Sequence, residues 1–272
     1  MSWPAMLSAF SGHSLDDQSA AALMDRVDTK FLVPVDRLVQ CLGGLSEHYS
    51  VLEMGGLRQM AYDTLYFDTP DRQLYRDHHN GKLNRMKVRI RHYRDSDAAF
   101  LEVKRKNNKG RTIKERRLLN TFPNSGQQQA GQLQPILRDV LGLSATRMSP
   151  ALFVHYRRTT LMNRTSCERV TVDTDLAFLS ALNGKRRTLP GLAVLELKSP
   201  LLLPDSPLGM RLKLLGYRPL AFSKYCVGTA LLAPEQVKTN RFKPVLGKLS
   251  RTVSQFKEPS WNRPSIPIFS FA

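Results

Sequence analysis

The sequence predicts an α+β protein built on an antiparallel β-sheet with flanking helices. Segments rich in β-branched and aromatic residues follow one another with short polar loops between them, and short loops join antiparallel neighbours. Many of these segments alternate charged with apolar residues, which places the charges on one face of each strand. Such a sheet either exposes its charged face to solvent or closes into a barrel with a polar interior. The alternation alone does not choose between them.

The N-terminal half contains most of the predicted hairpins. Residues 1–20 are expected to form a loose lead-in that could end in a short helix. A short amphipathic helix is predicted over 33–45, because Gly43 and Gly44 supply a stop signal. Residues 73–82, ending in an Asn-Gly turn signal, are expected to form a helical or looped crossover. The strands predicted in this half are 25–34, 58–70, 84–95, 98–107 and 111–119.

The C-terminal half repeats the strand pattern after a Gln-rich loop, 120–134, and a helix, 135–142. Beyond Ala233 the chain is Pro-rich and basic and lacks apolar periodicity, so residues 233–272 are predicted to be a flexible tail. The ordered domain is therefore expected to span 21–232. The remaining predicted elements are strands at 152–162, 169–180 and 191–199, a helix at 206–216, and a last ordered segment at 221–232.

The composition indicates a polyanionic partner. The chain has 272 residues, 42% of them hydrophobic, which is enough for a sizeable core. Forty-one Lys and Arg against twenty-three Asp and Glu give a formal net charge of +18. Such an excess is typical of proteins that bind nucleic acid, phosphate chains or an acidic membrane surface.

The cysteines and the apolar runs favour a soluble, cytoplasmic protein. Cys41, Cys167 and Cys226 lie far apart with no CxxC spacing, which argues against a zinc site and a disulfide framework. No apolar run approaches the roughly 20 residues that span a bilayer. The N-terminus lacks the basic and apolar regions of a signal peptide.

Two neighbouring predicted strands share a face crowded with positive charge. Lys87, Arg89 and Arg91 alternate onto one face of the first strand, and Lys104 lies on the matching face of the second. Like charges directly opposite each other in a sheet are destabilising. An anion on this face would make the arrangement tolerable.

Seven motifs follow one another along the chain: "LYFDTPDRQLY", "KVRIRHYR", "LEVKRK", "YRRTT", "VDTDL", "LELK" and "FSKY". Their order resembles the polyphosphate polymerase domain of the vacuolar transporter chaperone (VTC) family, which belongs to the triphosphate tunnel metalloenzymes alongside the CYTH phosphatases. The resemblance covers about Asp25 to Leu232 and implies an antiparallel β-barrel tunnel of about eight strands whose lumen binds linear phosphates. Because the family's membrane and regulatory domains are not evident in the sequence, we expect a bacterial, stand-alone form.

The resemblance implies that Lys and Arg in the lumen grip phosphate oxygens. Arginine can bind two phosphate oxygens at once, whereas lysine acts as a point charge. The residues expected to act in catalysis are Lys30, Arg89, Arg91, Lys104, Arg158, Lys198 and Lys224. Those expected to bind substrate are Arg26, Lys87, Lys106, Lys114, Arg116 and Ser223.

The resemblance also implies a divalent cation, Mn²⁺ or Mg²⁺. Glu196 is the first candidate ligand, because magnesium sites commonly use one or two carboxylates together with waters and substrate phosphates. Asp173, and with less support Asp175, could bind a second metal; an ion pair in the basic lumen is the alternative. Glu102 is expected to pair with Arg89 or Lys104.

Two positions depart from the family patterns. CYTH relatives carry Glu, Glu and Lys where this chain has Arg26, Asp28 and Lys30, which weakens metal binding on that strand. Polymerase members carry a lysine two residues before the serine of "FSKY", where this chain has Ala221. Lys114 and Arg116 are expected to replace part of that charge.

The leading functional hypothesis is an ATP-dependent polyphosphate polymerase with ATP and polyphosphate as partners. A hydrolase of tripolyphosphate or nucleoside triphosphates is the first alternative. A non-catalytic binder of polyphosphate or nucleic acid is the second. Nucleic acid is not expected, because a duplex cannot enter a lumen and no aromatic platform for single strands is evident.

Overall fold

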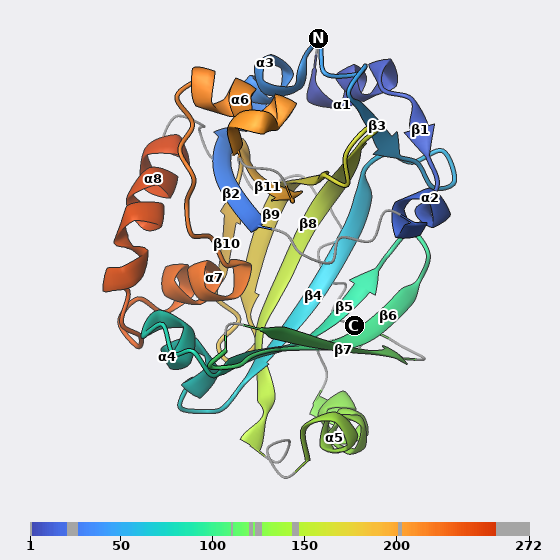
Figure 1. Ribbon diagram of the computed structural model, residues 1–272. Helices are drawn as coiled ribbons and strands as arrows, with labels where there is room; N and C mark the ends of the chain where they lie inside the picture. Colours follow the sequence, from blue (N-terminus) through green and yellow to red (C-terminus); the bar gives the residue numbers. More distant parts are fainter. Residues whose placement is uncertain are drawn as a thin grey trace, which may run out of the picture.

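The computed structural model describes residues 2–20, 27–109, 111–119, 122, 127–142, 147–200 and 203–253. An eleven-stranded sheet dominates this part of the chain (Figure 1). Eight strands form one continuous path in the order β2-β11-β9-β8-β4-β5-β6-β7. Their bounds are β2 Val27–Pro34, β4 Met60–Asp68, β5 Arg85–Tyr93, β6 Ala98–Lys106, β7 Thr112–Leu119, β8 Ser149–Asn163, β9 Arg169–Ser180 and β11 Leu192–Ser199.

Every neighbouring pair on this path is antiparallel. The predicted α+β class with a large antiparallel sheet of about eight strands is therefore confirmed. The ladder does not close into a strict barrel, since the described path ends at β2 on one side and at β7 on the other. Curvature nevertheless brings the ends together, because Lys30 of β2 and Lys114 of β7 line the same cavity.

Three short strands extend the sheet and were not predicted. β3 (Tyr49–Leu52) pairs with β8, and β1 (Gly12–His13) pairs with β3 in parallel. β10 (Arg186–Leu189) pairs with β9. All four residues of β3 are buried, so this strand lacks the alternation that marks a half-exposed strand in a sequence.

Helices cover the sheet at several places (Figure 1). The crossover predicted after β4 is helical and forms α4. No helix within the described ranges has both the length and the apolar character needed to cross a bilayer. The helices are α1 Trp3–Met6, α2 Leu15–Ala20, α3 Leu38–Leu42, α4 Gln73–His79, α5 Gln127–Leu141, α6 Pro207–Leu214, α7 Lys224–Leu232 and α8 Lys243–Val253; the 3-10 turns are Leu7–Ala9, Val35–Arg37, Leu203–Asp205 and Asn240–Phe242.

The short helix predicted at the end of residues 1–20 is present as α2, but the prediction of a loose lead-in before it is wrong. Trp3, Met6, Leu7 and Phe10 are buried in a core cluster that covers one face of β2, β9 and β11. Burial of large apolar side chains contributes about 1.5–3 kcal/mol each, which fixes the segment on the sheet.

The prediction of a flexible tail from residue 233 is wrong for its first part. Helix α8 buries Val245 and Leu249, with Phe242 just before it, in the same cluster as α7. Apolar residues four positions apart share a helix face, so this tail contains a short amphipathic stripe. Residues 254–272 lie outside the described residues.

Helix α7 packs closely against the sheet. A Cβ atom at Gly228 would lie 2.5 Å from a ring carbon of Phe178 and 2.8 Å from a methyl group of Leu152. Only glycine allows this approach. The hydroxyl of Ser223 caps the helix by accepting a hydrogen bond from the backbone N–H of Cys226 at 3.4 Å. The N-terminus of α7 is thereby held next to the charged face of the sheet.

A basic cavity as the candidate functional site

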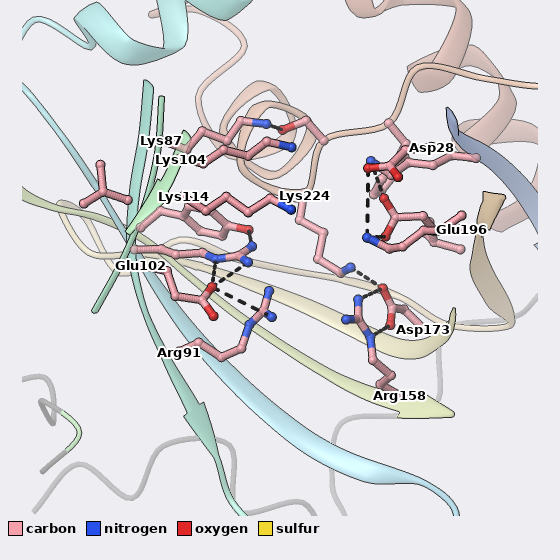
Figure 2. Close-up of a pocket in the computed structure, with 18 of the residues that line it drawn as sticks. Asp28, Lys87, Arg91, Glu102, Lys104, Lys114, Arg158, Asp173, Glu196 and Lys224 are labelled. Atoms are coloured by element: carbon pink, nitrogen blue, oxygen red, sulfur yellow. Dashed lines mark hydrogen bonds and ion pairs between the residues drawn. The ribbon is translucent and has the colours of Figure 1, made fainter. Parts of the chain in front are cut away.

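A cavity of about 360 Å³ lies on the charged face of the sheet (Figure 2). Ten Lys and Arg side chains and five carboxylates line it, an excess of five positive charges. We call it the basic cavity. Its charged lining residues are Asp28, Lys30, Lys87, Arg89, Arg91, Glu102, Lys104, Lys114, Glu115, Arg116, Arg158, Asp173, Glu196, Lys198 and Lys224.

Three lysines stand in one row across three adjacent strands. Lys87 of β5 is directly opposite Lys104 of β6, which is directly opposite Lys114 of β7. Within the described residues none of the three is ion-paired with a carboxylate, and Lys87 donates only to the hydroxyl of Ser223, at 3.1 Å. We call these three residues the lysine row. Figure 2 shows them together on one side of the cavity.

Burial and mutual repulsion weaken the charge of the lysine row. Burial, together with Lys30 and Arg89, lowers the pKa of Lys87 to about 8 despite an opposing contribution from Cys226. Partial burial and the neighbouring Lys87 lower the pKa of Lys104 to about 8 despite an opposing contribution from Asp28, which forms no ion pair with it. Lys104 remains the more exposed of the two lysines. An anion bound to this row would favour the charged form of both.

The next row along the same strands contains a compensating carboxylate. Arg89 grips Glu102 through Nε at 2.7 Å and Nη2 at 2.6 Å, which confirms the expected partner of Glu102. Arg91 and Arg116 lie farther from the carboxylate, at 3.9 Å and 3.8 Å. Burial would raise the pKa of Glu102, but Arg89 and Arg91 outweigh it and lower this pKa to about 2. One carboxylate is thus shared among three arginines.

Arg91 has spare hydrogen-bonding capacity deep in the basic cavity. It is 9% exposed, and its buried Nε has no partner within the described residues. The guanidinium carbon lies 5.7 Å from the centre of the Tyr62 ring. An aromatic face orients a guanidinium without using its N–H donors, which leaves these free for an anion.

On the opposite wall, Asp173 is fully engaged. Arg158 donates to it bidentately, from Nε at 2.6 Å and Nη2 at 2.9 Å, and Lys224 forms a short contact to Oδ2. Burial would raise the pKa of Asp173, yet Arg158 and Lys224 lower it to about 2. The side chain is only 2% exposed.

The rings of Tyr62 and Tyr156 lie beneath these cations. The two rings stack with centres 5.2 Å apart. Arg158 lies 5.4 Å from the first ring, and the Nζ of Lys224 lies 4.2 Å from the second. Cations held over aromatic faces lose less freedom when an anion binds.

Glu196 and Lys30 are cross-strand partners on β11 and β2. The Nζ of Lys30 lies 3.2 Å from one oxygen of Glu196, and the Nζ of Lys198 lies 3.4 Å from the other. Lys198 also approaches Asp28 at 4.0 Å. Burial opposes ionisation of Glu196, but Lys30 and Lys198 hold its pKa well below its usual range.

Helix α7 delivers Lys224 and Ser223 to the basic cavity, and a buried carboxylate anchors it. Asp68, at the end of β4, accepts backbone N–H groups of Leu74 at 2.8 Å and Tyr75 at 2.9 Å. The hydroxyl of Tyr225 donates a short hydrogen bond to Oδ2 of the same carboxylate. Asp68 therefore joins β4, α4 and α7.

The candidate metal ligands, Asp173 and Glu196, differ in how well their surroundings suit a divalent cation. Within the described residues, no three His, Cys, Asp or Glu side chains gather in a cluster that could hold a cation. Asp173 does not fit, because Arg158 and Lys224 occupy both of its oxygens; the ion-pair alternative fits instead. Glu196 lines the cavity, is ionised and faces only ammonium groups. It fits a cation held mainly by substrate phosphates.

Most of the predicted site residues line the basic cavity. Lys106 does not; it lines a second cavity at the end of β6. Asp175 lies off the cavity and approaches Arg157 at 3.8 Å. Arg26 lies outside the described residues. The predicted residues that line the cavity are Lys30, Lys87, Arg89, Arg91, Lys104, Lys114, Arg116, Arg158, Asp173, Glu196, Lys198, Ser223 and Lys224.

The tyrosines of the site were not predicted as functional residues. Tyr66 accepts a hydrogen bond from Arg89 at 3.3 Å and lines the cavity. Tyr62 and Tyr66 stand four residues apart on β4, hence on the same face as the arginines. This spacing was a usable signal, but in a strand it equally marks a buried aromatic core.

The fold and this cavity define a protein with one large antiparallel sheet whose charged face lines a basic cavity. The profile of the VTC domain matches residues 25–233, and the chain belongs to the VTC domain family. No curated protein matches the sequence.

Several solved structures resemble this chain at low sequence identity. An adenylate cyclase candidate from Bacillus halodurans is 14% identical, with a TM-score of 0.46, over 80% of this chain and 97% of that one. A Hippeastrum adenylyl cyclase candidate, described as having a dominant triphosphatase activity, is 17% identical with a TM-score of 0.45, over 76% and 96%. A conserved hypothetical protein from Pyrococcus furiosus is 13% identical with a TM-score of 0.41, over 73% and 98%.

Proposed function

We propose that this protein is a polyphosphate polymerase that transfers the γ-phosphate of ATP to a growing phosphate chain in the basic cavity. The observation that carries the proposal is the lysine row, which has no ion-paired carboxylate within the described residues. A row of like charges is destabilising in a sheet unless an anion occupies it. Membership of the VTC domain family supports phosphate as that anion.

Phosphoryl transfer requires positioning and charge neutralisation more than covalent catalysis by the protein. A terminal phosphate oxygen of the acceptor chain attacks the γ-phosphorus, the bond from that phosphorus to the bridging oxygen breaks, and ADP leaves. Arg91 and Arg158 would stabilise the transferred group: Arg91 is buried, the side chain of Arg158 is 14% exposed, and both lie against the ring of Tyr62. The lysine row holds neighbouring phosphates of the chain.

Glu196, with substrate phosphates, would hold Mg²⁺ or Mn²⁺, which supplies neutralisation of the charge that builds up on the phosphate oxygens. Lys30 and Lys198 keep this carboxylate ionised and oriented. On the other side of the cavity, Asp173 holds Lys224 in place, and Lys224 supplies a further fixed positive charge.

Hydrolysis of tripolyphosphate or nucleoside triphosphates is the second candidate. The observation that favours it is Ala221, which takes the place of a lysine in polymerase relatives. Phe222, Ser223 and Lys224 line the cavity, whereas Ala221 does not. A cavity with one cation fewer retains a long acceptor chain less strongly, and water then competes as the nucleophile.

The test is a product assay with ATP and either Mn²⁺ or Mg²⁺. Products are resolved on a gel stained for polyphosphate, while ADP and free phosphate are measured in parallel. Long chains with ADP, lost in Arg91→Ala but kept in Arg157→Ala, support the polymerase. Arg157 is a matched control because it neighbours Arg158 on β8 but is exposed and lies near Asp175. Free phosphate without chains supports the hydrolase; binding without either product supports a non-catalytic binder.

A further inference from the structure

A second cavity, of about 470 Å³, lies where β5 begins and β6 ends. Arg85 and Lys106 line it from the side of the sheet that faces the basic cavity, whereas Met86 and Arg105 line it from the other side. It therefore wraps around the ends of these strands. Arg147, just before β8, adds a further exposed cation. We call this site the outer basic groove.

The strand register links the outer basic groove to the lysine row. Arg85 is directly opposite Lys106, and Lys87 is directly opposite Lys104. The two pairs are two residues apart on the same face, a spacing of about 7 Å along the strands. The positive face of the basic cavity thus continues without interruption into the groove.

The acidic residues of the groove are already neutralised. Asp77 is bound by Lys82 at 2.8 Å and by the amide of Gln73 at 2.6 Å. Arg105 is itself paired with Glu115. By contrast, Arg85, Lys106 and Arg147 make no ion pair with a carboxylate anywhere in the described ranges. The groove therefore has uncompensated positive charge.

We propose that the outer basic groove binds the part of a polyphosphate chain that extends beyond the basic cavity. This inference rests on the proposed function and names a second segment of binding surface for it. A flexible chain of phosphates can follow a curved row of cations around the strand ends. None of the groove's lining residues is aromatic, so the groove lacks the stacking surface that single-stranded nucleic acid uses. The groove gives the protein a preference for long chains over short ones.

The test compares tripolyphosphate with long-chain polyphosphate as probes, binding each to the full-length protein by calorimetry. The variant is Arg85→Glu combined with Arg147→Glu. The matched control is Arg186→Glu combined with Arg187→Glu, two exposed arginines of β10 that change the net charge equally. We expect the groove variant to bind long chains about tenfold more weakly and tripolyphosphate as the wild type does. For long chains, the slope of the logarithm of the binding constant against the logarithm of the salt concentration should also be shallower by about one.

Each other outcome overturns a defined part of the proposal. If the variant loses affinity for both probes equally, the arginines act on the basic cavity and the groove is no separate site. If it binds both like the wild type, or the control loses as much, the inference fails while the proposed function stands. A wild type that binds neither probe removes the proposed function and the inference together. Equal loss with a single-stranded oligonucleotide as a third probe would identify a general polyanion surface instead.

Discussion

The lysine row and the wall opposite it hold their charges in opposite ways. On the wall of β2, β8, β9 and β11, which we call the paired wall, carboxylates accompany the cations: Asp173 binds Arg158 and Lys224, and Glu196 binds Lys30. On β5, β6 and β7, Glu102 pairs with Arg89, but the lysine row is left without such a partner within the described residues. The paired wall is complete without a ligand. The lysine row is held against repulsion, and a bound anion adds most stability there.

This difference predicts opposite effects of removing one charge from each wall. A buried charge that loses its partner costs several kcal/mol, because the remaining charge stays desolvated. A lysine removed from an uncompensated row relieves repulsion instead. Removing a cation from the paired wall should therefore lower both stability and phosphate affinity, whereas removing a cation from the lysine row should raise stability and lower phosphate affinity.

The largest expected effect is on the paired wall. Asp173→Asn leaves Arg158 and Lys224 without their carboxylate and should lower the free energy of unfolding by about 3–5 kcal/mol. Denaturant unfolding measures this loss. Asp175→Asn is the control, because Asp175 is on the same strand, is 61% exposed and has a positive φ of 54° that asparagine tolerates. It should cost less than about 0.5 kcal/mol. Equal losses in both variants would erase the distinction between the walls.

On the lysine row, Lys104→Met should raise the free energy of unfolding of the ligand-free protein by about 0.2–1 kcal/mol. The same variant should bind tripolyphosphate about tenfold more weakly, the equivalent of one charge-assisted hydrogen bond of about 1.5 kcal/mol. Calorimetry and unfolding of one preparation give both values. Lys213→Met, on the exposed side of α6, should change neither. A destabilised Lys104→Met protein would show that the row is compensated after all.

The anchor of α7 should affect binding through position. Tyr225→Phe removes one donor from the buried Asp68 and should cost about 1–2 kcal/mol of stability. It should also weaken tripolyphosphate binding several-fold, because Lys224 directly precedes Tyr225 in the first turn of α7 and shifts when this turn loosens. Tyr75→Phe is the matched control: its hydroxyl donates to the backbone oxygen of Lys238, away from the cavity, at 2.8 Å. Were both variants to weaken binding alike, the effect would be one of stability alone.

The smallest expected effect is in the pH dependence. Lys87 and Lys104 have pKa values of about 8, below the ordinary 10.5. Tripolyphosphate affinity should therefore fall as the pH rises through 8. Between about pH 8 and 10.5 the unfolded chain binds more protons than the folded one, so the ligand-free protein should gain stability over this window. Lys104→Met should flatten both profiles; an unchanged profile would assign the titration to other groups.

The sequence predicted the strands of the continuous path well. Alternation marks 85–93 and 98–106 because one face of each strand is charged and the other is largely buried. The strand 112–119 was predicted as well, although only its last residue is buried. The fully buried β3 has no such contrast. The apolar stripe of α8 is short, and Pro244 resembles a breaker although proline is favoured in a first helical turn. Local patterns did not indicate these elements because tertiary contacts hold them in place.

The sequence predicted which residues of the candidate site share a strand face. Alternation placed Arg89, Arg91 and Lys104 on one side, but it could not show that Lys104 stands between two other lysines. That fact depends on register, which pairs β6 with both β5 and β7. The engagement of Asp173 by two cations likewise depends on α7, whose contact with the sheet no local pattern specifies.

The most direct test of the central claim is a crystal structure of the full-length protein with tripolyphosphate. The lysine row as the anion site predicts phosphate oxygens within hydrogen-bonding distance of Lys87, Lys104 and Lys114, with a terminal phosphate at Arg91. It also predicts that the pairs Arg158–Asp173 and Lys30–Glu196 remain intact. Tripolyphosphate bound elsewhere, with the lysine row contacting only solvent, would contradict the claim.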